Sequence, residues 1–200
     1  GYSFGGNVAF QLAGAHYNLG MVGELCAEHT NAPEACNLPD IESDLLTLAG
    51  VEQIEGNMWS VVDDPVVDAV VGLAPGSMIP FGAEGLAMVD VPALIISGSI
   101  DNLVPPALTQ LTYDSISSDT KSLVWLENAG HFVFMDCDWQ TDAFIMMCAD
   151  RVWDRNRAYD LVNHFSTALF LSALYDDMDA RDALQSVQIP GVNYETVIGN

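Results

Sequence analysis

Cationic side chains are scarce in this sequence. Lysine and arginine total five, against 28 aspartate and glutamate residues, which gives a formal net charge of −23 at pH 7. Nucleic-acid binding and attachment to an anionic membrane both depend on cations that neutralise phosphates, so neither partner is expected. The surplus of carboxylates leaves two interpretations open. It can keep a solvated surface soluble, or it can mark an organism that lives at high salt, where charge repulsion is screened.

Long apolar runs, internal repeats and low-complexity tracts are also missing. Charges or turn residues interrupt every apolar run before it reaches the length of a membrane span, so no span is expected. Half of the 200 residues are hydrophobic, which predicts one sizeable core and one domain, or a large part of one. The glycines of "GYSFGG" lack the Gly-x-Gly-x-x-Gly spacing of a dinucleotide-binding domain, and no cofactor is predicted.

The four cysteines form two close pairs, Cys26 with Cys36 and Cys137 with Cys148. Four cysteines allow three connectivities, and the sequence does not choose among them. Local pairing would close two short loops, which suits a protein that is secreted or periplasmic. Two alternatives stay open: four free thiols in a cytosolic protein, and a metal site built from Cys26, His29 and Cys36. No Cys-x-x-Cys motif or second histidine pair supports a metal site, so none is predicted.

Strand-like and helix-like segments alternate along the chain. Short apolar runs within 66–76, 91–99 and 122–130 predict three strands. Helices are predicted within 7–20, 40–50, 105–116 and 154–175, and the end of the chain from residue 187 is expected to be irregular. This alternation predicts a parallel sheet with helices on its faces, whose functional residues gather at the carboxyl ends of the strands.

Three polar residues stand where such a sheet concentrates chemistry. Ser3 lies in "GYSFGG", Asp101 in "SGSIDNLVPP" after the second run, and His131 in "NAGHFVF" after the third. The chain order Ser, Asp, His with a Gly-x-Ser-x-Gly elbow is the signature of α/β-hydrolases. Together they predict a catalytic triad, with Asp136 and Asp138 as rivals for the acid. The other histidines lack a preceding strand and are interpreted as structural or exposed.

The residue types suit nucleophilic catalysis. A serine hydroxyl attacks when an imidazole accepts its proton, and a buried carboxylate fixes the tautomer of that imidazole. The elbow opens a helix, so the backbone N–H of Phe4 is predicted to face the developing oxyanion. The elbow is also expected to be crowded, with no room for a Cβ at Gly1 or Gly5, the glycines on either side of Ser3.

The motifs "GYSFGG", "VVGLAP", "LIISGSIDNLVPP" and "NAGHFVF" together resemble two related groups of α/β-hydrolases. These are the predicted dienelactone hydrolases and the platelet-activating-factor acetylhydrolases. The likeness runs from Gly1 to about residue 175 and includes "FGAEGL" and the cysteine pairs, which in the first group accord with export. The resemblance implies an α/β-hydrolase fold and hydrolysis of carboxylic esters. By this resemblance Ser3 is the nucleophile, Asp101 the acid and His131 the base, while residues 176–200 are peripheral.

The chain departs from the family in two residues and in its extent. Tyr2 stands where the family usually has histidine, which changes the pocket wall and leaves the proton relay in place. Dienelactone hydrolases proper use a cysteine nucleophile, so a serine favours generic ester hydrolysis. The family's sheet has several strands before the elbow, and a loop there supplies the second oxyanion donor. Residues 1–200 are therefore expected to be the carboxyl-terminal part of one longer hydrolase domain.

Apolar residues near the triad predict the substrate pocket. The candidates are Tyr2, Met78, Ile79, Phe81 and Phe132, and they favour an ester of an apolar acyl or aromatic group. Ordinary core packing is the alternative for each of them. Other functions stay open on the same motifs: a thioesterase or peptidase using the triad, and an inert hydrolase-fold fragment or binding module.

Overall fold

A computed structural model describes residues 1–28, 36–51, 54, 58–60, 67–76, 78–135, 150, 152–185 and 188–199. Within these ranges four strands form one sheet in the order β1 (Val70–Leu73), β2 (Ala93–Gly98), β3 (Lys121–Leu126) and β4 (Val192–Val197). Strands β1, β2 and β3 are parallel, and β4 is antiparallel to β3. The predicted α/β architecture with a mostly parallel sheet is thus confirmed.

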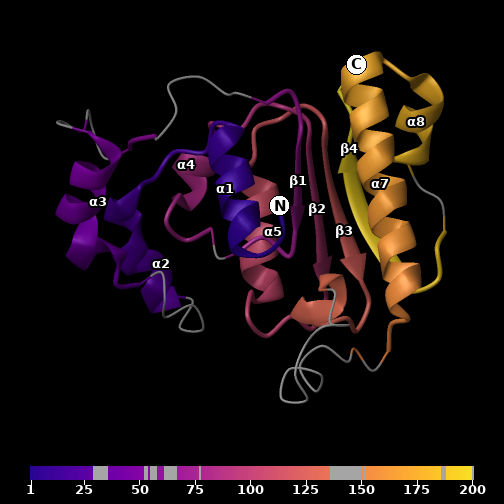
Figure 1. The fold of residues 1–200 in the computed structure, drawn as a ribbon, viewed down its shortest axis with the longest axis horizontal. Coiled ribbons are helices and arrows are strands. Elements are labelled where there is room, and N and C mark those ends of the chain that lie inside the picture. Colours follow the sequence, from indigo (N-terminus) through magenta and orange to yellow (C-terminus); the bar gives the residue numbers. More distant parts are fainter. Residues whose placement is uncertain are drawn as a thin grey trace.

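Helices connect the strands and flank the sheet (Figure 1). The α-helices are α1 (Phe4–Leu12), α2 (Val22–Glu28), α3 (Glu42–Ala49), α4 (Gly82–Leu86), α5 (Pro106–Ser115), α7 (Arg155–Tyr175) and α8 (Met178–Ala183). Short 3₁₀ helices are η1 (Leu19–Met21), η2 (Leu38–Ile41) and η3 (His131–Phe134). None of the helices in the described ranges is long and apolar enough to cross a membrane.

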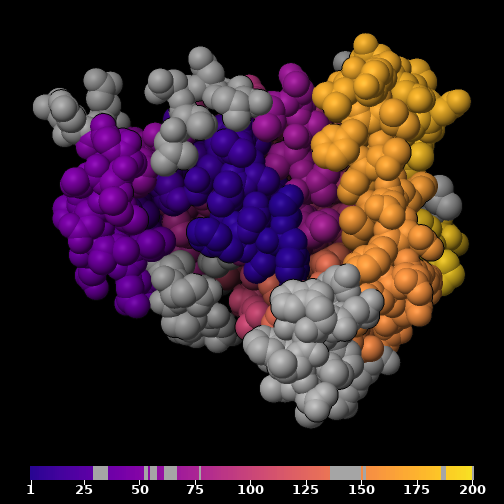
Figure 2. Space-filling view, in the orientation of Figure 1, coloured from indigo at the N-terminus to yellow at the C-terminus, as the bar shows by residue number. Residues whose placement is uncertain are grey.

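Apolar side chains on both faces of the sheet are buried. One face, with Leu94 and Ile96 of β2, packs against Phe165 and other residues of α7. The opposite face, with Ile95 of β2, packs against Phe10 of α1 and against residues of α4 and α5. This explains why every residue of β2 is buried and why the strand is apolar from Ala93 to Ile96, since successive residues of a strand point to opposite faces. Helices α1 and α7 lie on either side of the sheet, and both reach the surface in the view of Figure 2.

The first three residues extend the sheet beyond β1. Tyr2 forms a parallel bridge with Leu73, and the Leu73 N–H donates to the Gly1 carbonyl over 2.8 Å. The Ser3 N–H in turn donates to the Leu73 carbonyl over 2.9 Å. Residues 1–3 therefore lie beside β1 as a strand would, and their chain direction is the same. The carboxyl ends of this segment and of β1, β2 and β3 meet at one edge of the sheet.

Two local predictions differ from the structure. The helix predicted within 7–20 begins at Phe4 and ends at Leu12, because the chain turns at Gly14, whose φ of 106° lies outside the helical region. The chain end predicted to be irregular contains β4, which pairs with β3 along its whole length. The long predicted helix is confirmed as α7, and the Asp154 side chain caps it by accepting the Arg157 N–H.

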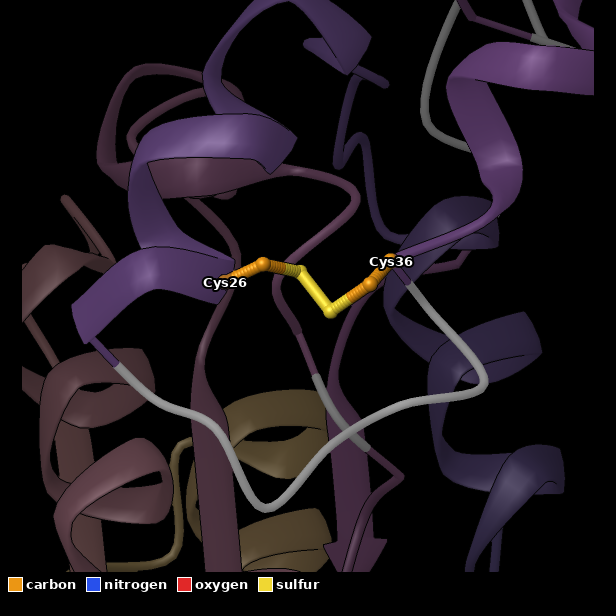
Figure 3. The surroundings of a disulfide bond; sticks show 2 residues. All are labelled: Cys26 and Cys36. Atoms are coloured by element: carbon orange, nitrogen blue, oxygen red, sulfur yellow. A yellow bond between two sulfur atoms is a disulfide. The ribbon is translucent and has the colours of Figure 1, made fainter.

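Cys26, near the end of α2, and Cys36, ahead of η2, form a disulfide bond with their Cα atoms 5.8 Å apart (Figure 3). The predicted local pairing is confirmed for these two residues. Their sulfurs bond to one another, so they are not the thiolate ligands of a metal site. A bridge over a sequence separation of 10 stabilises the fold by about 3 kcal/mol in the chain-entropy account. His29, Cys137 and Cys148 lie outside the described residues.

Candidate active site

Ser3 occupies a sharp turn between the segment beside β1 and helix α1. Its φ of 51° and ψ of −125° place a non-glycine residue in a sparsely populated backbone region. Hydrogen bonds on both sides hold the turn: the Ser3 N–H donates to Leu73, and the Ser3 carbonyl accepts the Gly76 N–H over 2.8 Å. Ser3 is the N-cap of α1, but its side chain makes no capping bond, so the hydroxyl is available for another partner.

The glycines that have no room for a Cβ at this turn are Gly1 and Gly6, whereas the predicted pair was Gly1 and Gly5. A Cβ at Gly1 would lie 2.0 Å from the Gly5 carbonyl oxygen, as expected, but a Cβ at Gly5 would meet no atom within 4 Å. The clash predicted for Gly5 is therefore wrong. The tight position is Gly6, where a Cβ would lie 2.7 Å from the Cα and Cβ of Pro75. Gly6 lets α1 approach the end of β1 closely, and Gly5 faces open space.

Asp101 follows β2 and lies buried, with 3% of its surface exposed. Its Oδ1 accepts the backbone N–H groups of Leu103 over 2.9 Å and Val104 over 2.8 Å. These bonds fix the carboxylate and leave Oδ2 for a third donor. The loop comes very close to the one after β3, since a Cβ at Gly98 would lie 2.2 Å from the Ala129 carbonyl oxygen.

His131 begins η3, after β3, and lies between the other two residues. Its Nδ1 is 2.6 Å from Asp101 Oδ2, and its Nε2 is 2.9 Å from Ser3 Oγ. Because a carboxylate oxygen only accepts, Nδ1 carries the proton in the neutral ring and Nε2 is left as an acceptor toward the serine hydroxyl. The structure thus brings the three predicted residues, far apart in sequence, into one hydrogen-bonded line.

Tyr2 contacts the histidine rather than open solvent. Its hydroxyl donates to the His131 carbonyl oxygen over 3.2 Å, and its ring centroid lies 5.3 Å from that of the imidazole. Burial, followed by the charges of Asp101 and Tyr159, raises the pKa of the Tyr2 hydroxyl to about 12. The hydroxyl therefore stays protonated at physiological pH and remains a donor. The side chain of Tyr2 therefore links the segment just before Ser3 to the backbone of His131.

Asp150 is a site residue that the sequence did not reveal. Its Oδ2 accepts the N–H of Gly130, next to His131, over 3.0 Å. Its Oδ1 accepts the N–H groups of Val152 and Trp153, each over 2.9 Å. One carboxylate thus joins the histidine loop to the segment that leads into α7. The spacing Asp-x-Val-Trp matches a local side-chain-to-backbone turn, but nothing in the sequence points to Gly130.

Of the five predicted pocket residues, Tyr2 contacts His131 and is not among the residues that line the hollow described below, and the other four fall into two groups. Met78 and Phe81 are buried in the cluster under α1, α4 and α5, and Ile79 is buried against Leu19 and Leu108. The structure therefore gives these three the packing role that was the alternative for each. Phe132 lines a hollow beside His131, and its ring packs edge-on against the imidazole at 5.5 Å.

Phe4 opens helix α1, and its side chain is 75% exposed beside Ser3. The first N–H groups of a helix have no partner within the helix, and the described residues include no acceptor for the Phe4 N–H, so this group can bind an anion next to Ser3. Asp136 and Asp138, the rivals of Asp101, lie outside the described residues. Within the described ranges, no three histidine, cysteine, aspartate or glutamate residues cluster so that they could hold a metal ion.

No protein-family model matches this chain, and no curated protein matches its sequence.

Proposed function

We propose that this protein is a serine hydrolase that cleaves carboxylic esters through an acyl-enzyme. One observation carries the proposal: the line from Ser3 Oγ through the His131 imidazole to Asp101, with links of 2.9 and 2.6 Å. The strained serine turn between a strand-like segment and a helix, at the carboxyl edge of a parallel sheet, supports an α/β-hydrolase fold.

The hydrogen-bonded line suits proton transfer from serine to histidine. As Ser3 Oγ attacks the ester carbonyl carbon, His131 Nε2 accepts the hydroxyl proton and the carbonyl oxygen becomes an oxyanion. Asp101 stabilises the imidazolium through the Nδ1–H bond, and its own position is fixed by two backbone donors. The Phe4 N–H, at the positive end of the α1 dipole, stabilises the oxyanion.

His131 completes each half of the reaction by giving up the proton that it has just accepted. His131 gives it to the alcohol oxygen, the ester C–O bond breaks, and the acyl group stays on Ser3. Water next attacks the acyl carbon while His131 takes one of its protons, and that proton returns to Ser3 as the acid leaves. With a net charge of −23, the protein repels anionic substrates at low salt, so a neutral ester is the fitting substrate.

We further propose that the protein is exported and works in an oxidising compartment, secreted or periplasmic. The Cys26–Cys36 disulfide supports this, because glutathione and thioredoxin keep most cytosolic thiols reduced.

A fluorophosphonate probe tests the hydrolase proposal. Ser3 should be labelled, and peptide mass spectrometry should place the label on that residue. His131→Ala should abolish labelling because the serine loses its base. His164→Ala, at an exposed position on α7, should label like the wild type. An unlabelled Ser3 in the folded wild-type protein, or equal labelling of His131→Ala, would overturn the proposal.

A further inference from the structure

A hollow of about 540 Å³ lies beside His131, within the size range of small-molecule sites. Its walls come from the loop that carries Asp101, the loop that carries His131, and residues 150 and 152. The triad chemistry does not require such a hollow.

Apolar side chains line the hollow although solvent reaches them. Ile100 is 59% exposed, Leu103 45% and Val152 61%, and Phe132 and Val133 complete the apolar wall. Exposed apolar residues scattered singly are ordinary, but several that converge on one concave surface indicate a binding site. An apolar ligand group is therefore the fitting occupant of this hollow.

The backbone of this wall is fixed. The Ile100 N–H donates to Ala129 over 3.1 Å, the Leu103 N–H to Asp101, and the Val152 N–H to Asp150. The backbone of the wall is therefore already in place before a ligand binds, and binding does not have to order it.

We propose that this hollow binds the alcohol half of the ester, and that the preferred alcohol is uncharged and apolar. This inference rests on the proposed hydrolase function. His131 must deliver its proton to the alcohol oxygen, so the group attached to that oxygen leaves along the histidine, and His131 itself lines the hollow.

Charge in the hollow agrees with an uncharged occupant. Asp150 is the charged residue among its lining side chains, and its carboxylate is held by three backbone N–H groups. Among the described residues that line the hollow there is no cation for an anionic alcohol, and the charge of Asp150 repels one. An uncharged apolar chain meets no charge repulsion there, and it gains apolar contact with Ile100 and Leu103.

A matched pair of variants tests the proposal. Leu103→Asn makes the wall polar at nearly constant side-chain size. Leu174→Asn is the same change on α7, at a leucine that is 48% exposed and outside the hollow. Both positions are partly exposed, and thermal unfolding checks that both variants fold.

The first measurement is the affinity for 1-hexanol, determined by NMR or calorimetry. This measurement requires no catalytic turnover. Leu103→Asn should weaken hexanol binding by about tenfold, the low end of what a lost apolar contact costs a pocket. Leu174→Asn should bind hexanol like the wild type. Equal binding by all three proteins would overturn the proposal.

The second measurement is kcat/KM for methyl, butyl and hexyl acetate. In the wild type it should rise by about fourfold for each methylene that enters the hollow. Leu103→Asn should flatten this rise, while the rate of deacylation, measured after the alcohol has left, stays the same. An unchanged rise in Leu103→Asn would overturn the proposal. If no ester is cleaved and Ser3 takes no label, the hydrolase proposal falls, and hexanol binding still decides whether the hollow holds an alcohol.

Discussion

Replacing Asp101 with asparagine separates the catalytic role of this residue from its structural one. An asparagine whose carbonyl oxygen takes the Oδ1 position keeps both bonds from the backbone N–H groups of Leu103 and Val104. Its NH₂ group then stands where Oδ2 met His131 Nδ1 at 2.6 Å. Because that group donates, Nδ1 must be unprotonated and the ring proton moves to Nε2. An Nε2–H facing Ser3 Oγ at 2.9 Å cannot accept the serine proton.

The expected effect on activity is large and the effect on stability small. The wrong tautomer lowers kcat by about 10⁴ at a Ser-His-Asp triad. That factor equals about 5.4 kcal/mol of added barrier at 1.36 kcal/mol per tenfold. All three hydrogen bonds at residue 101 keep a donor and an acceptor, so the free energy of unfolding should change by less than about 1 kcal/mol. Asp101→Ala is the contrast, since it leaves two backbone N–H groups without an acceptor and should lose about 2–6 kcal/mol.

The assay combines labelling rate and urea unfolding on the same preparations. Asp101→Asn should lose fluorophosphonate reactivity and ester turnover while it unfolds at the wild-type urea concentration. Asp101→Ala should lose reactivity and stability together. An asparagine variant within tenfold of wild-type kcat would refute the tautomer argument. So would a loss of activity that merely follows a loss of stability.

Three further predictions concern the stability of the fold. Gly5→Ala should raise the free energy of unfolding by roughly 0.5–1 kcal/mol, because the added Cβ meets no atom within 4 Å. Gly6→Ala should lower the free energy of unfolding by about 1–3 kcal/mol, because its Cβ clashes with Pro75. Urea unfolding of the two variants and the wild type measures both changes. Lys121→Met should lower the free energy of unfolding by about 1.5–3 kcal/mol, because the Lys121 ammonium donates to three carbonyl oxygens at and after the end of α5. Lys121→Arg keeps a donor there and should lower the free energy of unfolding less. The pKa of Tyr2 is raised from 10.0 to about 12, so the folded state favours the neutral hydroxyl. The stability that this preference adds is fully present below pH 10 and is lost as the pH rises through 12. Unfolding measured from pH 9 to 12 should therefore show a steeper loss in the wild type than in Tyr2→Phe.

The sequence was most informative where local rules and burial agree. Strand β2 begins with four apolar residues, Ala93–Ile96, and is followed by turn residues, so the sequence shows its position and that of Asp101 after it. Helix α7 carried a clear amphipathic pattern with a capping aspartate at its start. The three site residues were predictable because each follows a strand or strand-like segment, and parallel strands bring their carboxyl ends to one edge.

Features that depend on distant partners were not predictable. Strand β4 alternates buried and exposed residues, but its identity as a strand depends on antiparallel pairing with β3, about 70 residues earlier along the chain. The roles of Met78 and Phe81 depended on which way the chain turns after β1, and it turns them into the core. The room at Gly5 and the lack of room at Gly6 likewise depend on where Pro75 lies, which neither glycine reveals.

The geometry at Ser3, His131 and Asp101 depends on groups that take no part in proton transfer. The serine turn is held through its own N–H and carbonyl, and the aspartate through the two donors on Oδ1. The histidine begins the 3₁₀ helix η3 and has two further contacts with residues outside its loop. It is held from outside, by the Tyr2 hydroxyl on its carbonyl and by the Asp150 carboxylate on the preceding N–H. Loss of either contact therefore loosens the base while the nucleophile and acid stay fixed. Ser3 labelling should respond to changes at Tyr2 and Asp150 although neither residue touches the serine hydroxyl.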